Sequence, residues 1–348
     1  MLYTKENNNE IFTLINEKDN NIISEMNNRD RVQLMMSLRK YLLELRKTID
    51  IDKNIKFGTE IEFEDANREK IEIDLYSTFP EYDWVVKDDK SLYNGAEAVS
   101  KVLSDNEETW NSLSAACEII SNNAKVVSGA SAHIHICMNI IGNNPKYWRN
   151  FAKLWMTYEN VIFRFLYGEY TSPREGMEKY AKPISNFLIE NFDRIEDRAQ
   201  MISANYMMKV LNAGDDRRRA INFRNASNTE LYNFNREVDK NTIECRVANG
   251  TFNPIIWQNN INLLVKLLEY SKREDFNEEI IDRRLKETIS KEIPGSIYKY
   301  SQINIDSAIE LADLIFNNNL DKIYFLRQYL KDMTIGTKPL TKSKSFTI

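Results

Sequence analysis

Three glutamates recur at every second position of one short segment in this 348-residue sequence, Phe57-Gly58-Thr59-Glu60-Ile61-Glu62-Phe63-Glu64. Side chains two residues apart share one face of a β-strand, so the spacing predicts a strand with an acidic face and a mainly apolar one. Carboxylates crowded on one face repel each other unless a cation lies between them. Hard divalent ions such as Mg²⁺ bind carboxylate oxygens, usually together with substrate phosphates. The segment is a candidate metal site, and a solvated strand face is the simpler interpretation.

Other predicted strands carry matching side chains. The sequence has only two histidines, His133 and His135, and their spacing places both on one strand face. Glu244 and Arg246 also share a face, and they form either a surface ion pair or a metal carboxylate beside a guanidinium that neutralises phosphate oxygens. Glu97 lies on one face of a further short strand.

A basic triplet, Arg217-Arg218-Arg219, leads into a predicted strand that ends at Arg224. Such a triplet is usually a solvated turn, but at the start of a strand it suits a partner that carries phosphate. Glutamates and arginines on adjacent strands together favour a magnesium nucleotide, because the carboxylates hold the ions and the arginines offset charge during phosphoryl transfer.

The elements that would position these residues are short strands set between helices. Periodicity predicts strands at 55–64, 84–86, 95–103 and 131–138, and two more that begin near 217 and 241. A charged connector follows the first strand. Predicted helices lie within 10–48, from a cap at Ser104 or Asp105 to about 124, at 145–168, 183–210, 255–270, 280–291, 306–315 and 320–333.

Composition narrows the partners and the compartment. A net charge of −5 gives no electrostatic support for broad nucleic-acid binding. The three widely spaced cysteines argue against a disulfide framework and fit a reducing compartment, and Cys137 and Cys245 are expected to be small buried hydrophobes. The polar N-terminus does not resemble a signal peptide, and no apolar run reaches the roughly 20 residues of a spanning helix. We therefore expect a cytoplasmic protein with no nucleic-acid or membrane partner.

The motifs in order resemble the putative amidoligase family of carboxylate–amine ligases. The resemblance covers about residues 56–257. Three motifs depart from the family pattern, at Asp89-Lys90-Ser91 for Asp-Gly-Ser, Ser100-Lys101 for Ser-Pro and Ala130-Ser131-Ala132 for Cys-Gly-Leu, so substrate choice is not carried over. The motifs that carry the resemblance are Phe57-Gly58-Thr59-Glu60-Ile61-Glu62, Asp89-Lys90-Ser91-Leu92, Glu97-Ala98-Val99-Ser100, His133-Ile134-His135, Tyr180-Ala181-Lys182-Pro183, 217–222 and 244–253.

The resemblance implies an α+β fold with a curved antiparallel sheet of the glutamine-synthetase-like type, flanked by helices. It implies a catalytic core over 51–272, an N-terminal helical extension at 1–50, and a C-terminal helical region with a basic tail at 273–348. ATP would phosphorylate a carboxylate, and an amine would attack the acyl phosphate to give an amide. Expected substrates are a peptide, protein or amino-acid carboxylate and an amine acceptor, with ATP and Mg²⁺ as cofactors.

The resemblance also implies roles for particular residues. Motif position favours Arg217 as the phosphate arginine, whereas strand alternation favours Arg218, which would share a face with Asn222 and Arg224. One of the two histidines would contact the nucleotide phosphates or a metal, and His135 is preferred. The expected magnesium ligands are Glu60, Glu62, Glu97 and Glu244; the expected catalytic residues are Glu60, Glu62, Glu244, Arg246 and Arg217; and the nucleotide-binding residues are His133, His135, Arg217, Arg246 and Asn222.

Three alternatives stay open. A metal-dependent hydrolase would use His133, His135 and a glutamate, since a site of three histidines is excluded in a chain with two. A catalytically silent binding module would keep the ligase fold, and a kinase of the same fold type would phosphorylate without ligating. The sequence leaves the substrates and the oligomeric state open, a homo-oligomer included.

Overall fold

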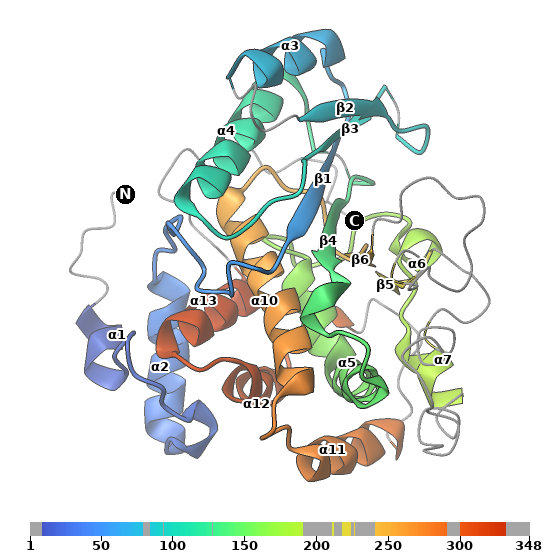
Figure 1. Ribbon diagram of the computed structural model, residues 1–348. Coiled ribbons are helices and arrows are strands. Elements are labelled where there is room, and N and C mark those ends of the chain that lie inside the picture. The colour runs from blue at the N-terminus through green and yellow to red at the C-terminus, as the bar shows by residue number, and fades with distance from the viewer. Residues whose placement is uncertain are drawn as a thin grey trace.

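An antiparallel sheet lies at the centre of the computed structural model (Figure 1). The structure describes residues 9–78, 84–92, 94–126, 128–190, 211, 218–223, 226, 241–290 and 300–331. Within these ranges six strands form one sheet in the order β2-β3-β1-β4-β6-β5. The strands are β1 (Phe57–Phe63), β2 (Val85–Asp88), β3 (Ala96–Val99), β4 (Ala132–Cys137), β5 (Ile221–Asn222) and β6 (Thr242–Cys245).

Strand alternation decides which side chains face the core. In β1, Ile61 and Phe63 are completely buried on one face, while Glu60 and Glu62 occupy the other. The same alternation places Ile134 of β4 in the core and His133 on the opposite face. The sequence predicted this alternation correctly for the central strands.

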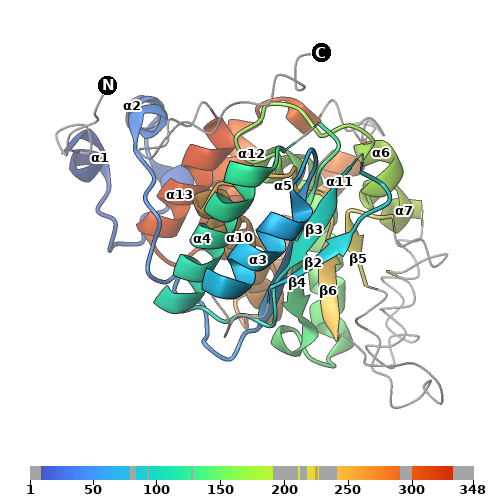
Figure 2. The same ribbon diagram turned by 90° about the horizontal axis from the view of Figure 1, so that it is seen from above.

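Helices cover the apolar face. Helix α10 (Pro254–Lys272) packs against β4, and it also contacts α5 (Pro145–Leu166) and α4 (Glu107–Asn123). Figure 2 shows α4 and α10 on one side of the sheet, and α6 (Met177–Tyr180) and α7 (Ser185–Glu190) near its β5 end, where α7 packs on α5. Asn253 caps α10 by accepting from Ile255 N at 3.0 Å, and the following proline has no amide hydrogen to leave unpaired.

Two local expectations were wrong. The charged connector after β1 contains a helix, α3 (Arg68–Thr78), which packs on α4 through Ile71 and Leu75. The cap of α4 is Asn106, which accepts from Thr109 N at 2.8 Å. Asp105 instead accepts from the backbone of another segment, as described below.

The N-terminal and C-terminal segments pack together. Helices α1 (Asn9–Leu14) and α2 (Asn28–Lys40), with the short turn η2 (Ile23–Glu25), meet α12 (Ile305–Ile315) and α13 (Asn319–Leu330). Asn21 N donates to Asn319 Oδ1 at 2.9 Å, and Ile23 N donates to Asp313 Oδ1 at 3.0 Å. Helix α11 (Glu278–Ser290) lies against α5. The basic tail lies outside the described residues, and the division of the chain at residues 50 and 272 stays a prediction.

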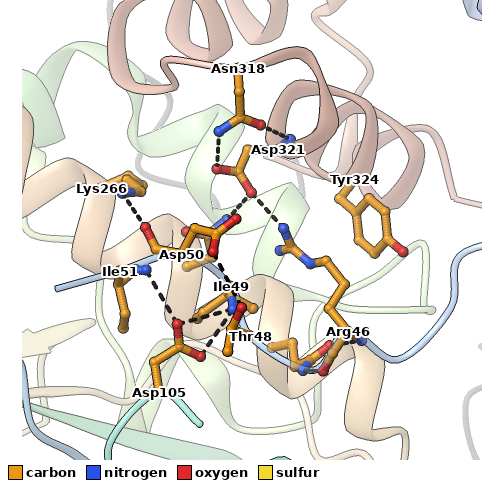
Figure 3. A network of polar contacts seen from close by, with 12 residues as sticks. Arg46, Thr48, Ile49, Asp50, Ile51, Asp105, Lys266, Asn318, Asp321 and Tyr324 are labelled. Carbon is orange, nitrogen blue, oxygen red and sulfur yellow. Dashed lines mark hydrogen bonds and ion pairs between the residues drawn. The ribbon is translucent and has the colours of Figure 1, made fainter. Parts of the chain in front are cut away.

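The segment after α2 was expected to be helical to residue 48, but the helix ends at Lys40. The segment crosses α10 in a non-helical conformation because polar side chains of the core hold its backbone (Figure 3). Asp105 accepts from Ile49 N at 2.9 Å and from Ile51 N at 3.3 Å, and Arg46 Nη1 lies 2.7 Å from Asp321 Oδ1. Among the described residues, no helix is both long enough and apolar enough to span a membrane.

Candidate active site

The candidate site is a row of polar side chains across five strands, on the face opposite the helices. Directly opposed residues of antiparallel strands project to the same side of a sheet. The register pairs Glu60 with His133, and it pairs His135 with Glu244. It also pairs Glu62 with Glu97 and Asn222 with Glu244. The structure therefore brings together every expected glutamate and both histidines.

Glu60 lies at the centre of the row. Its Oε2 is 3.0 Å from His133 Nδ1, and its Oε1 is 3.0 Å from His135 Nε2. Only 8% of Glu60 is exposed. Burial opposes its ionisation, but the hydrogen bonds from the two histidines outweigh burial and hold the pKa of Glu60 well below its usual range. The carboxylate is thus an anion in a site with little water.

His133 lies between two carboxylates. Besides its contact with Glu60, its Nε2 is 2.8 Å from Ser131 Oγ and 3.5 Å from Glu62 Oε1. Burial alone would lower the pKa of His133, but Glu62 and Glu60 together raise it above its ordinary value. Glu62 is fixed in turn, because Ser131 N donates to its Oε2 at 2.7 Å. The imidazole and both carboxylates therefore have defined positions.

Glu97 is an acid of the row whose pKa is raised rather than lowered. It is half-buried on β3, opposite Glu62. Burial raises the pKa of Glu97 to about 7, and the negative charge of Glu60 contributes to that rise. The structure therefore places a carboxylate where a second negative charge is unfavourable unless a cation is added.

Glu244 is fixed by a cation and an amide. Arg246 forms an ion pair with its Oε1, and Asn222 Nδ2 donates to its Oε2 at 2.7 Å. Burial would raise the pKa of Glu244, but His133, Arg246 and His135 lower it below its usual value. Glu244 and Arg246 thus form an ion pair. It is not a surface ion pair, because only 5% of Glu244 is exposed.

Two groups of ligand atoms in the row could each hold a metal ion, with the atoms of each group within 4.8 Å of one another. Both groups include Glu60. Within the part of the chain that the structure describes, Glu62 belongs to neither group, although the sequence analysis expected it to be a ligand. The first group is Glu60, Glu97 and His133, and the second is Glu60, His135 and Glu244.

A pocket of about 330 Å³ opens beside this row. Glu62, His133 and Arg246 connect it to the candidate metal ligands. Arg174, which no sequence pattern indicated, also lines it. Its position follows from loop contacts rather than from periodicity, since Asn249 Oδ1 accepts from Arg174 N at 2.9 Å. The pocket lining also includes Glu64, Asp89, Ser91, Leu92, Gly129, Ser131, Glu175, Tyr180 and Arg218.

The basic triplet is described only in part. Arg217, the arginine that motif position favoured, and Arg224 lie outside the described residues. Arg218 lines the pocket, whereas the Arg219 guanidinium lies 4.5 Å from the centre of the Phe187 ring. Strand alternation cannot assign the triplet, because β5 begins only at Ile221.

The cysteines take no part in the row. Cys245 is buried on the core side of β6, and burial raises the pKa of its thiol to about 12. Cys137 is only half-buried, so the expectation that it would be buried was wrong. Cys245 thus has the inert, buried character that the sequence analysis expected.

Comparison with known proteins shows that the sequence matches one protein family. A family model described as putative amidoligase enzyme matches residues 81–268, more than half of the chain. The match includes Glu97, both histidines, Glu244 and Arg246, whereas β1 with Glu60 precedes it. Strand pairing with β3 and β4 joins β1 to the matched region. No curated protein matches the sequence.

Proposed function

Since the chain belongs to the amidoligase family, we propose that it is an ATP-dependent carboxylate–amine ligase. It would form an amide bond between a peptide, protein or amino-acid carboxylate and an amine. One observation carries the proposal: the buried carboxylate of Glu60 is shared by two groups of candidate metal ligands beside a pocket that contains arginines. The antiparallel sheet, with all site residues on one face, supports a fold of the glutamine-synthetase-like type.

The two groups of ligands fit Mg²⁺. Each offers two carboxylates and one imidazole, a set rich in the oxygen ligands that hard cations prefer. A cation beside Glu97 would also relieve the repulsion that this carboxylate meets from Glu60 and Glu62. We assign one ion to Glu60, Glu97 and His133, and a second to Glu60, His135 and Glu244. Glu62 would then support His133 and the Ser131 backbone rather than bind metal directly.

The reaction would proceed in two steps. An oxygen of the substrate carboxylate bonds to the γ-phosphorus of ATP, the bond from that phosphorus to the bridging oxygen breaks, and ADP leaves. The amine nitrogen then attacks the acyl carbon and loses a proton, while the C–O bond to phosphate breaks and phosphate takes the electron pair. Phosphorylation is needed because a carboxylate oxygen is a poor leaving group.

The residues of the chain would prepare these steps by electrostatics and positioning. When bound, Mg²⁺ supplies positive charge to the phosphate oxygens. Arg246, held by Glu244, offers a second fixed positive charge at the edge of the pocket. His133 and His135 hold Glu60 through both of its oxygens, so its orientation is set before any ligand binds.

The geometry does not favour the hydrolase alternative. A site with two histidines and one carboxylate needs both imidazoles on a single ion. Among the described residues, His133 and His135 belong to different groups and contact different oxygens of Glu60. The two histidines thus divide between two candidate ions.

Calorimetric titration with ATP, with and without Mg²⁺, tests the proposal together with metal analysis of the purified protein. We expect ATP binding that requires Mg²⁺ and no tightly held zinc or iron. A stoichiometric transition metal without nucleotide binding would indicate the hydrolase, and neither signal would indicate a binding module. Once substrates are found, product analysis separates a ligase, which gives an amide, from a kinase, which gives a stable phosphorylated product.

A further inference from the structure

Arg174 is a buried guanidinium without a carboxylate partner in the described part of the chain. Only 4% of the residue is exposed, yet it lines the pocket. Its two side-chain hydrogen bonds go to backbone carbonyls, from Nη1 to Gly129 O at 3.2 Å and from Nη2 to Arg246 O at 3.5 Å. Its Nε is buried and has no hydrogen-bond partner among the described residues. A guanidinium has five N–H donors, so this one retains capacity for an anion.

The loop that carries Arg174 is fixed before any ligand arrives. Asn249 accepts from Arg174 N at 2.9 Å and donates from its own Nδ2 to Ser172 O at 3.0 Å. Glu175 N donates to Ser128 O at 2.8 Å, which joins the loop to the other rim of the pocket. A buried guanidinium that forms no ion pair among the described residues costs free energy, and a bound anion would offset that cost.

The same pocket also contains a carboxylate, Asp89, that could bind a cationic group of a ligand. Asp89 is half-buried, and its Oδ1 accepts from Ser91 N at 2.8 Å. Burial lowers the pKa of Arg174, and the negative charges of Glu62 and Asp89 oppose that lowering. The pocket thus presents both a guanidinium, Arg174, and a carboxylate, Asp89, to a ligand.

These features select among ligands. The carboxylates of Glu62, Glu64 and Asp89 disfavour a polyanion in this pocket unless the candidate metal ions are bound beside it. A volume of about 330 Å³ suits a small molecule. Leu92 and Tyr180 add apolar surface between the charged groups. A small molecule with one anionic and one cationic end satisfies all of these conditions.

We propose that this pocket binds a free zwitterionic amino acid, with its carboxylate on Arg174 and its ammonium group facing Asp89. The inference deepens the proposed function, on which it rests, by naming the substrate class. Arg174 is then a substrate-binding residue.

The test is a thermal-shift screen of the protein with the twenty standard L-amino acids in the presence of MgATP. Each amino acid that raises the melting temperature is titrated again as its carboxamide and as its N-acetyl derivative. We expect both derivatives to lose the shift, because each lacks one of the two charges. Arg174→Gln and Asp89→Asn should each weaken binding of the amino acid by about 10- to 100-fold, as expected for loss of a charged hydrogen bond.

Controls separate this inference from the proposed function. Arg273→Gln removes a guanidinium that pairs with Asp275 away from the pocket, and it should bind the amino acid as the wild type does. MgATP affinity is measured on every variant and should be unchanged in Arg174→Gln. If Arg174→Gln does not fold, two other variants test whether the amino acid binds in this pocket. These are Arg174→Lys, which keeps the charge, and Asp89→Asn.

The remaining outcomes have defined meanings. If MgATP binds but no amino acid shifts the melting temperature, the pocket assignment is wrong and the ligase proposal stands. If Arg174→Gln weakens MgATP instead, Arg174 is a phosphate contact and the inference is overturned. If an amino acid binds through Arg174 while MgATP does not bind, the ligase proposal fails and the pocket assignment survives.

Discussion

Glu60 and His133 lie directly opposite each other on β1 and β4, and Glu60 Oε2 is 3.0 Å from His133 Nδ1. The contact depends on strand register, because a slip of one residue would turn Glu60 toward the apolar core. Ile61 and Ile134, which are completely buried, fix that register from the other face. Core packing on one side of the sheet therefore sets the geometry of the polar site on the other.

Glu60→Gln should abolish binding of MgATP and leave the fold intact. The amide keeps the size of the side chain but removes the negative charge that both candidate ions share. Changes beside metal ligands cost up to about 100-fold in metal affinity, so loss of a shared ligand should cost at least that much. Calorimetry measures the affinity and circular dichroism the fold, with exposed Glu69→Gln of α3 as the matched control. Unchanged affinity in Glu60→Gln would show that Glu60 binds no metal.

Arg246→Gln should destabilise the protein by about 1–3 kcal/mol, because it leaves the buried carboxylate of Glu244 without its cation. The pKa of Glu244, now held low, should rise. The double variant Arg246→Gln with Glu244→Gln should recover part of the loss, since no unpaired charge remains. Urea denaturation at pH 7 measures all three proteins. Equal stability of the single and double variants would mean that the unpaired charge of Glu244 is not the cause of the loss.

Asp105→Ala should lower the free energy of unfolding by about 2–3 kcal/mol. Its carboxylate accepts from Ile49 N and Ile51 N (Figure 3). It also accepts from Trp110 Nε1 at 2.7 Å, so three donors lose a charged acceptor. Asp105→Asn keeps one acceptor oxygen and should lose less. Denaturation curves compare them with Glu107→Ala, which removes only a surface contact with Lys47. A loss in Glu107→Ala as large as that in Asp105→Ala would contradict the explanation.

Stability should fall as the pH rises from about 4.5 to 7, in part because of Glu169. Its Oε2 is buried without a hydrogen-bond partner among the described residues, and burial raises the pKa of Glu169 to about 7. Between the two pKa values the folded protein retains a proton that the unfolded chain has lost, so raising the pH favours unfolding. Glu169 should lower the free energy of unfolding by on the order of 1–3 kcal/mol over this pH range, and Glu169→Gln should remove that decline. Melting temperatures of both proteins at pH 5 and pH 8 provide the measurement, and parallel decline in both would rule Glu169 out.

The strands that carry the candidate site could be predicted because alternation is a local signal. Glu60, Glu62, His133 and His135 each have an apolar neighbour that must enter the core, so their shared direction follows from the sequence alone. The same holds for α5 and α10, whose apolar stripes and Asn-Pro starts are strong signals. Helix α3 was missed because only Ile71 and Leu75 form its apolar stripe, too few to indicate a helix.

Burial of the acidic face could not be predicted. A solvated strand face was the simpler interpretation for Glu60, and a surface ion pair was one interpretation for Glu244, but the structure buries more than nine-tenths of each. The residues that enclose the site, such as Ser131 and Arg174, belong to loops without periodicity and are far from β1 in the sequence. Asp105 was expected to cap a helix for a similar reason: no local pattern shows that the backbone of residues 49–51 is the better partner.

The contacts that join the N-terminal segment to α12 and α13 link residues about 290 positions apart. The ribosome completes α2 long before it makes Asp313 and Asn319, so the first helices wait for their partners during almost the whole of synthesis. The sheet and α10 can assemble meanwhile, because their strands are already present. Docking of the early helices is therefore a late step in folding on the ribosome, and their apolar faces are the surfaces that chaperones would need to protect until then.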